Sequence, residues 1–370
     1  ITSFKEDGLH RTLLEISKKK NSREIVTGGN INYRKNRFQI GLSGVYHEFN
    51  RMYNPVLREY NRYYLRDSSN YNLSVDYSYQ LPGVVFAGET AVAKNGSLAT
   101  VNSLQYSPSS NSSLKILYRN YPVTYNALYG QAFSEGSTIQ NENGLFFGAD
   151  FNPFRHLFLS SYIDVIKFPW PKYGIDLPSK AVDIYFSGTY TFSSNSFIEA
   201  RFKYKQKEKN RNYPDKDTQT VLPYDTHKFR LRFNHETNDG WGFRSTADLS
   251  HYTEKYSPSE NGIMISQNIS YRGDGRVTGD LFLSWFEADT YNARLYSYER
   301  NLLSTFYMPS FYGKGVRIAF SVKYQITSKL TFSAKAGHTN YFNRDTIGSG
   351  AEQIDDNRRT DLYTYLRLRF

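Results

Sequence analysis

Apolar and polar residues alternate one by one along most of this chain. The last ten residues, 361–370, show the pattern clearly: one set of alternate positions carries Leu, Thr and the terminal Phe370, and the other carries Tyr and Arg. A period of two is typical of a β-strand with one apolar and one polar face. The sequence therefore predicts a final strand that ends on an aromatic residue of its apolar face.

The same alternation recurs through the whole length, for example over residues 71–80, 182–192, 198–205, 228–234, 316–325 and 330–336. A tight turn is predicted at 193–196, and hairpin-type dipeptides are Asn95-Gly96, Asn143-Gly144, Asp239-Gly240, Asn261-Gly262 and Asp274-Gly275. Roughly eighteen segments follow the pattern, and many reach the roughly 9–11 residues with which a tilted strand crosses a bilayer.

These segments predict an all-β fold, a transmembrane antiparallel up-and-down β-barrel of roughly 16–20 strands that forms one domain over residues 1–370. The alternative is a soluble β-sandwich, whose two sheets also alternate. Sandwich strands average about 5–6 residues, whereas residues 181–205 indicate a much longer hairpin. In lipid a sheet must close, because open edges leave backbone groups unpaired. We favour the membrane barrel.

Composition supports a barrel and excludes a helical membrane protein. Aromatic residues make up 17% of the chain, while its mean hydropathy is −0.63. A membrane helix needs an apolar run of about 18 residues or more, and the longest runs here are short, such as Val84 to Ala87. Tyrosine, with 33 copies, suits positions where an apolar body meets water at one end.

Several longer segments interrupt the alternation and are predicted to be loops: 50–68, 120–140, 206–226, 288–314 and 343–358. The chain begins Ile1-Thr2-Ser3 without the basic start and apolar core of a signal peptide. For an exported protein this predicts a mature or trimmed sequence, and we expect an N-terminal portion to be missing.

The net charge of +11 has two interpretations: a surface that binds nucleic acid or anions, or a barrel whose lumen, loops and rim carry Lys and Arg. We favour the second, because the charges alternate with apolar residues. The candidate lumen-lining residues on polar faces are Arg201, Lys203, Lys205, Arg230, Arg232, Arg317, Lys323, Arg367 and Arg369. Carboxylates on neighbouring strands, Asp183, Glu199, Glu236 and Asp248, are the alternative that would neutralise them.

No catalytic motif, cofactor motif or metal motif stands out. The seven His residues lie far apart, and His227 and His235 are eight positions apart. We therefore expect no enzyme and no cofactor. The acidic segment 345–356 suggests a calcium-held loop or, as we prefer, a solvated loop. The Arg- and Tyr-rich segment 50–66 suggests either a clamp for single-stranded nucleic acid or glycans or, as we prefer, an aromatic girdle whose basic residues bind anionic headgroups.

Several segments resemble a group of Bacteroidota outer-membrane proteins described as helix-hairpin-helix or competence-related. The resembling segments are residues 8–12, 132–136, 168–179, 295–299 and 345–350. The resemblance covers most of the chain and implies a large barrel preceded by a small helix-hairpin-helix region. Nothing in these 370 residues looks like that region, so we expect no nucleic-acid partner for this segment.

Together these features predict a pore or transport component in the outer membrane of a Gram-negative bacterium. The alternatives are a structural or assembly subunit with a plugged lumen, and a barrel associated with DNA uptake. Expected partners are membrane lipid, lipopolysaccharide, the barrel-assembly machinery and other envelope proteins. The assembly machinery would read the C-terminal signal Leu366, Leu368 and Phe370.

Overall fold

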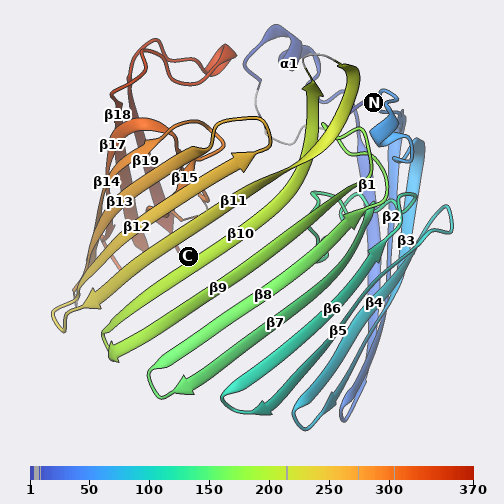
Figure 1. The fold of residues 1–370 in the computed structure, drawn as a ribbon, viewed down its shortest axis with the longest axis horizontal. Helices are drawn as coiled ribbons and strands as arrows, with labels where there is room; N and C mark the ends of the chain where they lie inside the picture. Colours follow the sequence, from blue (N-terminus) through green and yellow to red (C-terminus); the bar gives the residue numbers. More distant parts are fainter. Residues whose placement is uncertain (4–7, 9, 214–215, 274, 304) are drawn as a thin grey trace. The chain divides into compact units, whose positions relative to one another are not determined.

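Long antiparallel strands make up most of the computed structural model, which describes residues 1–3, 8, 10–213, 216–273, 275–303 and 305–370 (Figure 1). The strands are β1 (Glu24–Lys35), β2 (Phe38–Tyr53), β3 (Asp67–Leu81), β4 (Val84–Ala93), β5 (Leu98–Ser109), β6 (Ser112–Tyr121), β7 (Glu142–Phe154), β8 (Leu157–Phe168), β9 (Ser179–Ser193), β10 (Ser196–Tyr213), β11 (Lys216–Glu236), β12 (Trp241–Glu254), β13 (Glu260–Arg272), β14 (Val277–Ala288), β15 (Leu295–Tyr296), β16 (Ser310–Phe311), β17 (Gly313–Gln325), β18 (Leu330–Tyr341) and β19 (Arg358–Leu368). The helical elements are α1 (Leu13–Ser17) and the 3₁₀ turns η1 (Glu59–Asn61) and η2 (Gly350–Glu352). Among the described residues, no helix is both long and apolar enough to span a membrane.

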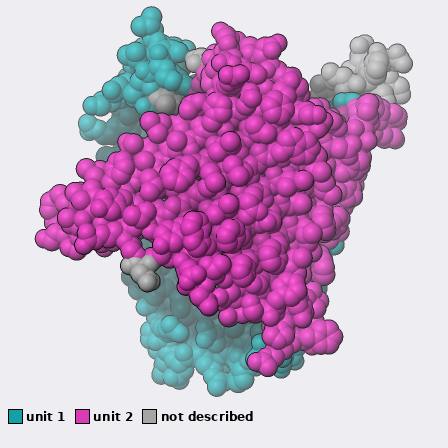
Figure 2. Space-filling model, turned by 90° about the vertical axis from the view of Figure 1, so that its left-hand side faces the viewer, with its two compact units in different colours: residues 1–150, 162–183, 207–223 teal, residues 151–161, 184–206, 224–370 magenta. Residues whose placement is uncertain are grey.

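The chain forms two units, which Figure 2 colours separately. Unit 1 contains residues 1–150, 162–183 and 207–223, and unit 2 contains residues 151–161, 184–206 and 224–370. In unit 1, each strand from β1 to β6 pairs antiparallel with the next one in sequence. In unit 2, the order of paired strands is β11, β12, β13, β14, β17, β18 and β19. Sequence neighbours pair throughout, apart from the short β15–β16 ribbon that interrupts unit 2.

The two faces of each strand differ in the way the alternation predicts. On β17, Ile318 and Phe320 are 49% and 50% exposed, whereas Arg317 and Ser321 are 4% and 8% exposed. The large apolar residues are thus outside and the polar residues are covered. Water would favour the reverse arrangement, whereas a bilayer around a polar interior favours this one.

Some of the predicted turns are present, whereas two of the hairpin-type dipeptides lie inside strands. Gly96 and Gly240 have φ of +80° and +82° and lie in tight turns, and the turn between β9 and β10 lies at 194–195, as predicted. Asn143-Gly144 and Asn261-Gly262 are not turns: they lie inside β7 and β13. Close packing explains both glycines, since a Cβ on Gly262 would approach the Ala293 carbonyl oxygen to 2.5 Å. Asp274 lies outside the described residues.

Most of the predicted loops are loops, and one is not. The connections 122–141, 289–312 and 342–357 match the prediction, and the loop predicted at 50–68 is shorter, because β2 runs to Tyr53. The loop predicted at 206–226 is wrong, because β10 continues to Tyr213 and β11 begins at Lys216. The part of a strand that extends beyond a bilayer needs no apolar face. Charged residues can then occupy both of its faces, and the sequence there shows no alternation.

The fold class predicted from the sequence, a transmembrane antiparallel up-and-down β-barrel of roughly 16–20 strands, is confirmed. Of the nineteen strands among the described residues, seventeen belong to the main sheet and expose apolar faces, and β15 and β16 form a separate short ribbon. The described helical elements have only three to five residues each.

We expect Phe320→Arg to lower the free energy of unfolding in lipid vesicles by about 2–4 kcal/mol, because a charge on the lipid face must be taken into hydrocarbon. The measurement is a denaturant titration of vesicle-inserted protein. Gln325→Arg, at the end of the same strand, is the control and should change stability by less than about 1 kcal/mol. Equal effects at both positions would show that the Phe320 face does not contact lipid.

Candidate functional site

A buried group of charged side chains fixes a long connection onto the polar face of unit 2. The connection is residues 289–312, which lies between β14 and β17 and contains the β15–β16 ribbon. Its Glu299 is 1% exposed and lies against Arg317 of β17 and Lys335 of β18, which are 4% and 3% exposed. We call residues 289–312 the inward segment.

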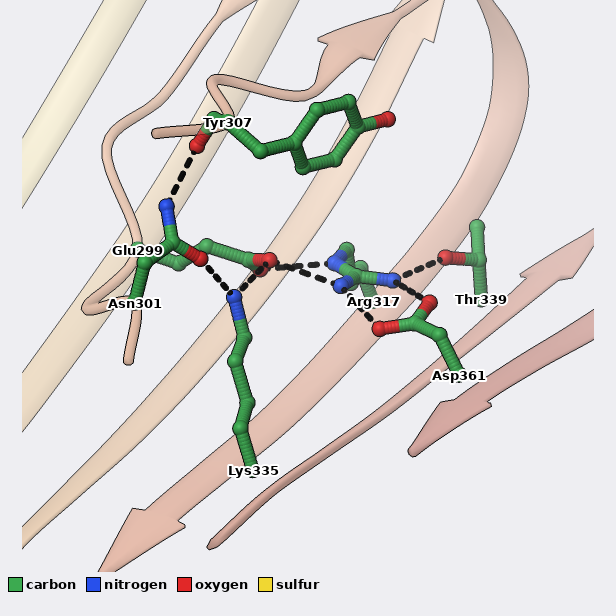
Figure 3. Close-up of polar contacts among 7 residues, drawn as sticks. All are labelled: Glu299, Asn301, Tyr307, Arg317, Lys335, Thr339 and Asp361. Atoms are coloured by element: carbon green, nitrogen blue, oxygen red, sulfur yellow. Dashed lines mark hydrogen bonds and ion pairs between the residues drawn. The ribbon is translucent and has the colours of Figure 1, made fainter. Parts of the chain in front are cut away.

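Arg317 is the centre of this group, as Figure 3 shows. Its Nε and Nη2 both donate to the Glu299 carboxylate, at 2.7 Å each. Its Nη1 donates to Thr339 Oγ1 at 2.8 Å, and both terminal nitrogens lie 3.2 Å from the Asp361 carboxylate of β19. Lys335 Nζ donates to Glu299 at 2.6 Å. Two cations thus face two carboxylates, and the buried group is neutral.

Breaking such a group is costly, because one deleted partner leaves an uncompensated buried charge, at a cost of about 3–5 kcal/mol. Burial raises the pKa of Glu299, but hydrogen bonds and charge from Arg317 and Lys335 outweigh it and leave the pKa below its usual value of 4.5. A carboxyl group whose pKa is lower in the folded than in the unfolded protein stabilises the folded state at pH values above its unfolded pKa. That stabilisation is lost as the pH falls below 4.5 through the lowered pKa.

A glycine makes room for the guanidinium. Arg317 lies on β17 and Asp361 on β19, so the arginine crosses β18, whose Gly337 pairs with Asp361. A Cβ on Gly337 would lie 2.5 Å from Arg317 Nη2 and 2.6 Å from Asp361 Oδ2. Only glycine fits beneath this ion pair.

Unit 1 contains a similar arrangement around Arg119 of β6. The Arg119 Nε donates to Glu142 at 2.5 Å, and its two terminal nitrogens donate to Asp164 of β8 at 2.9 and 3.0 Å. Gly144 of β7 lies beneath the guanidinium, because a Cβ there would collide with it. The Glu142 carboxylate also accepts backbone N–H groups from Glu135 and Gly136 at 2.9–3.0 Å.

In each unit, an arginine therefore crosses a glycine on the next strand to reach an aspartate two strands away. The same arginine also binds a glutamate that involves a connection: Glu142 accepts N–H groups from the connection 122–141, and Glu299 is part of the inward segment. We call each of these arrangements an arginine anchor. Two of the segments that carry the family resemblance, 132–136 and 295–299, contribute the backbone or side-chain groups held by the anchors.

Other contacts hold the inward segment of unit 2. Arg230 Nη2 donates to the Tyr296 carbonyl oxygen at 2.8 Å, and Arg300 lies 3.0 Å from Asp280 of β14. Phe311 packs on Phe286, with ring centroids 5.0 Å apart. The segment is therefore bound at both of its ends and in its middle.

The predicted lumen-lining residues differ in their burial and in their charged partners. Arg201 and Arg232 both pair with Glu199, at 2.7 and 3.3 Å, and Arg230 pairs with Asp248 at 2.5 Å. The carboxylates Glu199 and Asp248 thus neutralise part of the basic set, as the alternative interpretation expected. Arg317 is the anchor, Lys203 and Lys205 are half-buried, Lys323 and Arg367 line a cavity, and Arg369 is exposed.

Sequence reasoning missed most of the anchor residues. Arg317 was predicted to line a lumen, but Glu299, Lys335 and the whole Arg119 group were not singled out. The signal lay in glycines inside strands, and Gly144 was interpreted as part of a turn. No group of three or more His, Cys, Asp or Glu side chains in the described part of the chain is placed to hold a metal ion.

No family model and no curated protein matches the chain. Several solved structures have a similar fold. A loop-deletion form of OmpT of Vibrio cholerae is 11% identical, with 94% of this chain and 97% of that chain covered and a TM-score of 0.40. The anion-selective porin from Comamonas acidovorans is 8% identical, with 94% and 100% covered and a TM-score of 0.44. The FrpB iron transporter from Neisseria meningitidis is 9% identical, with 93% and 64% covered and a TM-score of 0.48.

These similarities concern the fold and not the function. The expectation that the chain is not an enzyme needs correction, because a fold alone does not exclude catalysis. Structures named OmpT stand beside porins and transporters among the similar folds, and one fold can host several functions. The exclusion of an enzyme is therefore withdrawn.

We expect Gly337→Ala to lower the free energy of unfolding by about 1–3 kcal/mol, because the added methyl group would push Arg317 away from Asp361. Gly279→Ala in β14 is the matched control: its Cβ would have only the Ser321 carbonyl oxygen nearby, at 3.9 Å. Denaturant titration of both variants checks this. Equal stability of the two would refute the role given to Gly337.

Proposed function

We propose that this protein is a pore or transport component of the outer membrane of a Gram-negative bacterium. The observation that carries the proposal is the inverted distribution of side chains, with apolar residues exposed and ion pairs and hydroxyl groups covered. Such a strand wall suits a barrel with lipid outside and water inside. The outer-membrane proteins with similar folds agree with this location.

In this proposal the polar face borders the lumen, and the predicted basic residues on that face line it. Arg201, Arg230 and Arg232 would act mainly as partners of Glu199 and Asp248. Lys323 and Arg367 would contribute positive potential, because no carboxylate contacts them within the described residues. A positive lining favours anions over cations.

The inward segment would narrow the passage. It lies on the polar face and is held by the arginine anchor and by Phe311. The same attachment favours a second candidate function, a structural or assembly subunit whose lumen is plugged. The anchor in unit 1 supports that candidate too, since it fixes residues 135–136 to the polar face.

The finer assignments are also part of the proposal. We propose one barrel domain, relatives among Bacteroidota proteins of the helix-hairpin-helix type, and partners that include lipopolysaccharide, the assembly machinery and other envelope proteins. Leu366, Leu368 and Phe370 are exposed and would serve as the assembly signal. A role in DNA uptake is the weakest alternative, and we propose no nucleic-acid contact for this segment.

Shortening the inward segment tests the function. Tyr296 pairs with Ser310, so residues 297–309 can be replaced by Asn-Gly to close a hairpin. Lys335→Gln and Asp280→Asn are added because the deletion removes Glu299 and Arg300, their charge partners. We expect single-channel conductance in planar bilayers to rise at least about twofold over the wild type. Heat-modifiable migration in electrophoresis would verify folding, and the full-length chain with Lys335→Gln and Asp280→Asn is the control.

Folded protein with no conductance before and after shortening would contradict the pore and favour the plugged subunit. Unchanged conductance would show that the inward segment does not narrow the passage.

A further inference from the structure

Two cavities lie on the polar face of unit 2, and residues of the inward segment line both of them. The first has a volume of about 340 Å³ and the second about 330 Å³. Asp280, Tyr298, Arg300 and Asn301 line both cavities and form their common wall. Cavities of this size accept small solutes.

Their charged lining is mostly basic. Arg244, Arg272 and Arg300 line the first cavity, and Arg300, Lys323 and Arg367 line the second. The two cavities together thus have five basic side chains against two carboxylates, Glu236 and Asp280. Asp280 is paired with Arg300 at 3.0 Å. The four other basic side chains therefore outnumber the one other carboxylate, Glu236.

The register explains why these side chains converge. Arg244 pairs with Asn268 of β13, Ser270 pairs with Asp280, and Arg272 pairs with Thr278, which in turn pairs with Lys323. The side chains therefore lie on one face of four adjacent strands. In the described part of the chain, Arg272, Lys323 and Arg367 make no ion pair with a carboxylate, so their charge is available to a ligand.

We propose that the two cavities form a binding site for small oxyanions, that is, solutes that carry a carboxylate or a phosphate. Guanidinium groups offer paired donors that match the oxygens of both groups. Tyr298, which is 53% exposed, lines both cavities together with Arg300 and can offer a hydroxyl donor. The site gives the proposed pore a substrate class, and in that sense it rests on the proposed function.

Anion binding is measured by a method that does not depend on conductance. The binding site and the proposed pore can therefore be refuted independently of each other. The experiment is calorimetric titration of the folded protein in detergent with inorganic phosphate and with citrate, with glucose as the uncharged control. We expect saturable binding of at least one of the two anions and none of glucose. The variant Arg272→Gln should weaken binding at least tenfold, and Arg272→Lys should retain part of it.

Lys329→Gln is the matched control, because it removes the same charge from an exposed turn of unit 2 outside both cavities. It should change the affinity less than twofold. Equal weakening by Arg272→Gln and Lys329→Gln would overturn the site and indicate only general attraction of anions. Absence of saturable binding in a conducting protein would overturn the site alone, and binding in a protein that does not conduct would overturn only the pore.

Discussion

The arrangement of the polar face depends on one interaction, a buried arginine that must be neutralised where it lies. A buried guanidinium without partners is strongly unfavourable, so each anchor surrounds it with carboxylates. Arg317 uses Asp361 from a strand and Glu299 from the inward segment, and Arg119 uses Asp164 and Glu142. Because one carboxylate of the Arg317 anchor comes from a connection, neutralising the arginine also fixes that connection in place.

The anchors link the fold to the proposed function. The strands supply a wall with an apolar outer face, but the strands alone do not determine which solutes could pass along the polar face. The inward segment, held by Arg317, Lys335 and Arg230, changes that surface. It contributes to the lining of both cavities and adds Arg300 to the cavity that Arg272 and Arg244 line. The same contacts would thus narrow a passage and create its anion selectivity.

The strands could be predicted from the sequence because lipid on one side and polar surroundings on the other impose a period of two. The ends of β10 and β11 could not be predicted, because the part of a strand beyond a bilayer is not forced to alternate apolar and polar residues. The anchors could not be predicted either: Arg317 and Asp361 meet only through the registers of β17, β18 and β19, and a period of two does not fix register. Gly144 shows the same limit, since Asn-Gly is typical of turns but here lies under Arg119.

Hydrogen–deuterium exchange of the inward segment tests the central claim most directly. In Glu299→Gln the anchor loses the one of its two carboxylates that belongs to the inward segment, and amides at 295–301 should exchange at least about tenfold faster than in the wild type. Glu287→Gln is the matched control, since it removes an exposed partner of Lys314, 3.2 Å away, and should leave those amides unchanged. Equal exchange in the wild type and both variants would contradict the account, because the segment would then be held without its anchor.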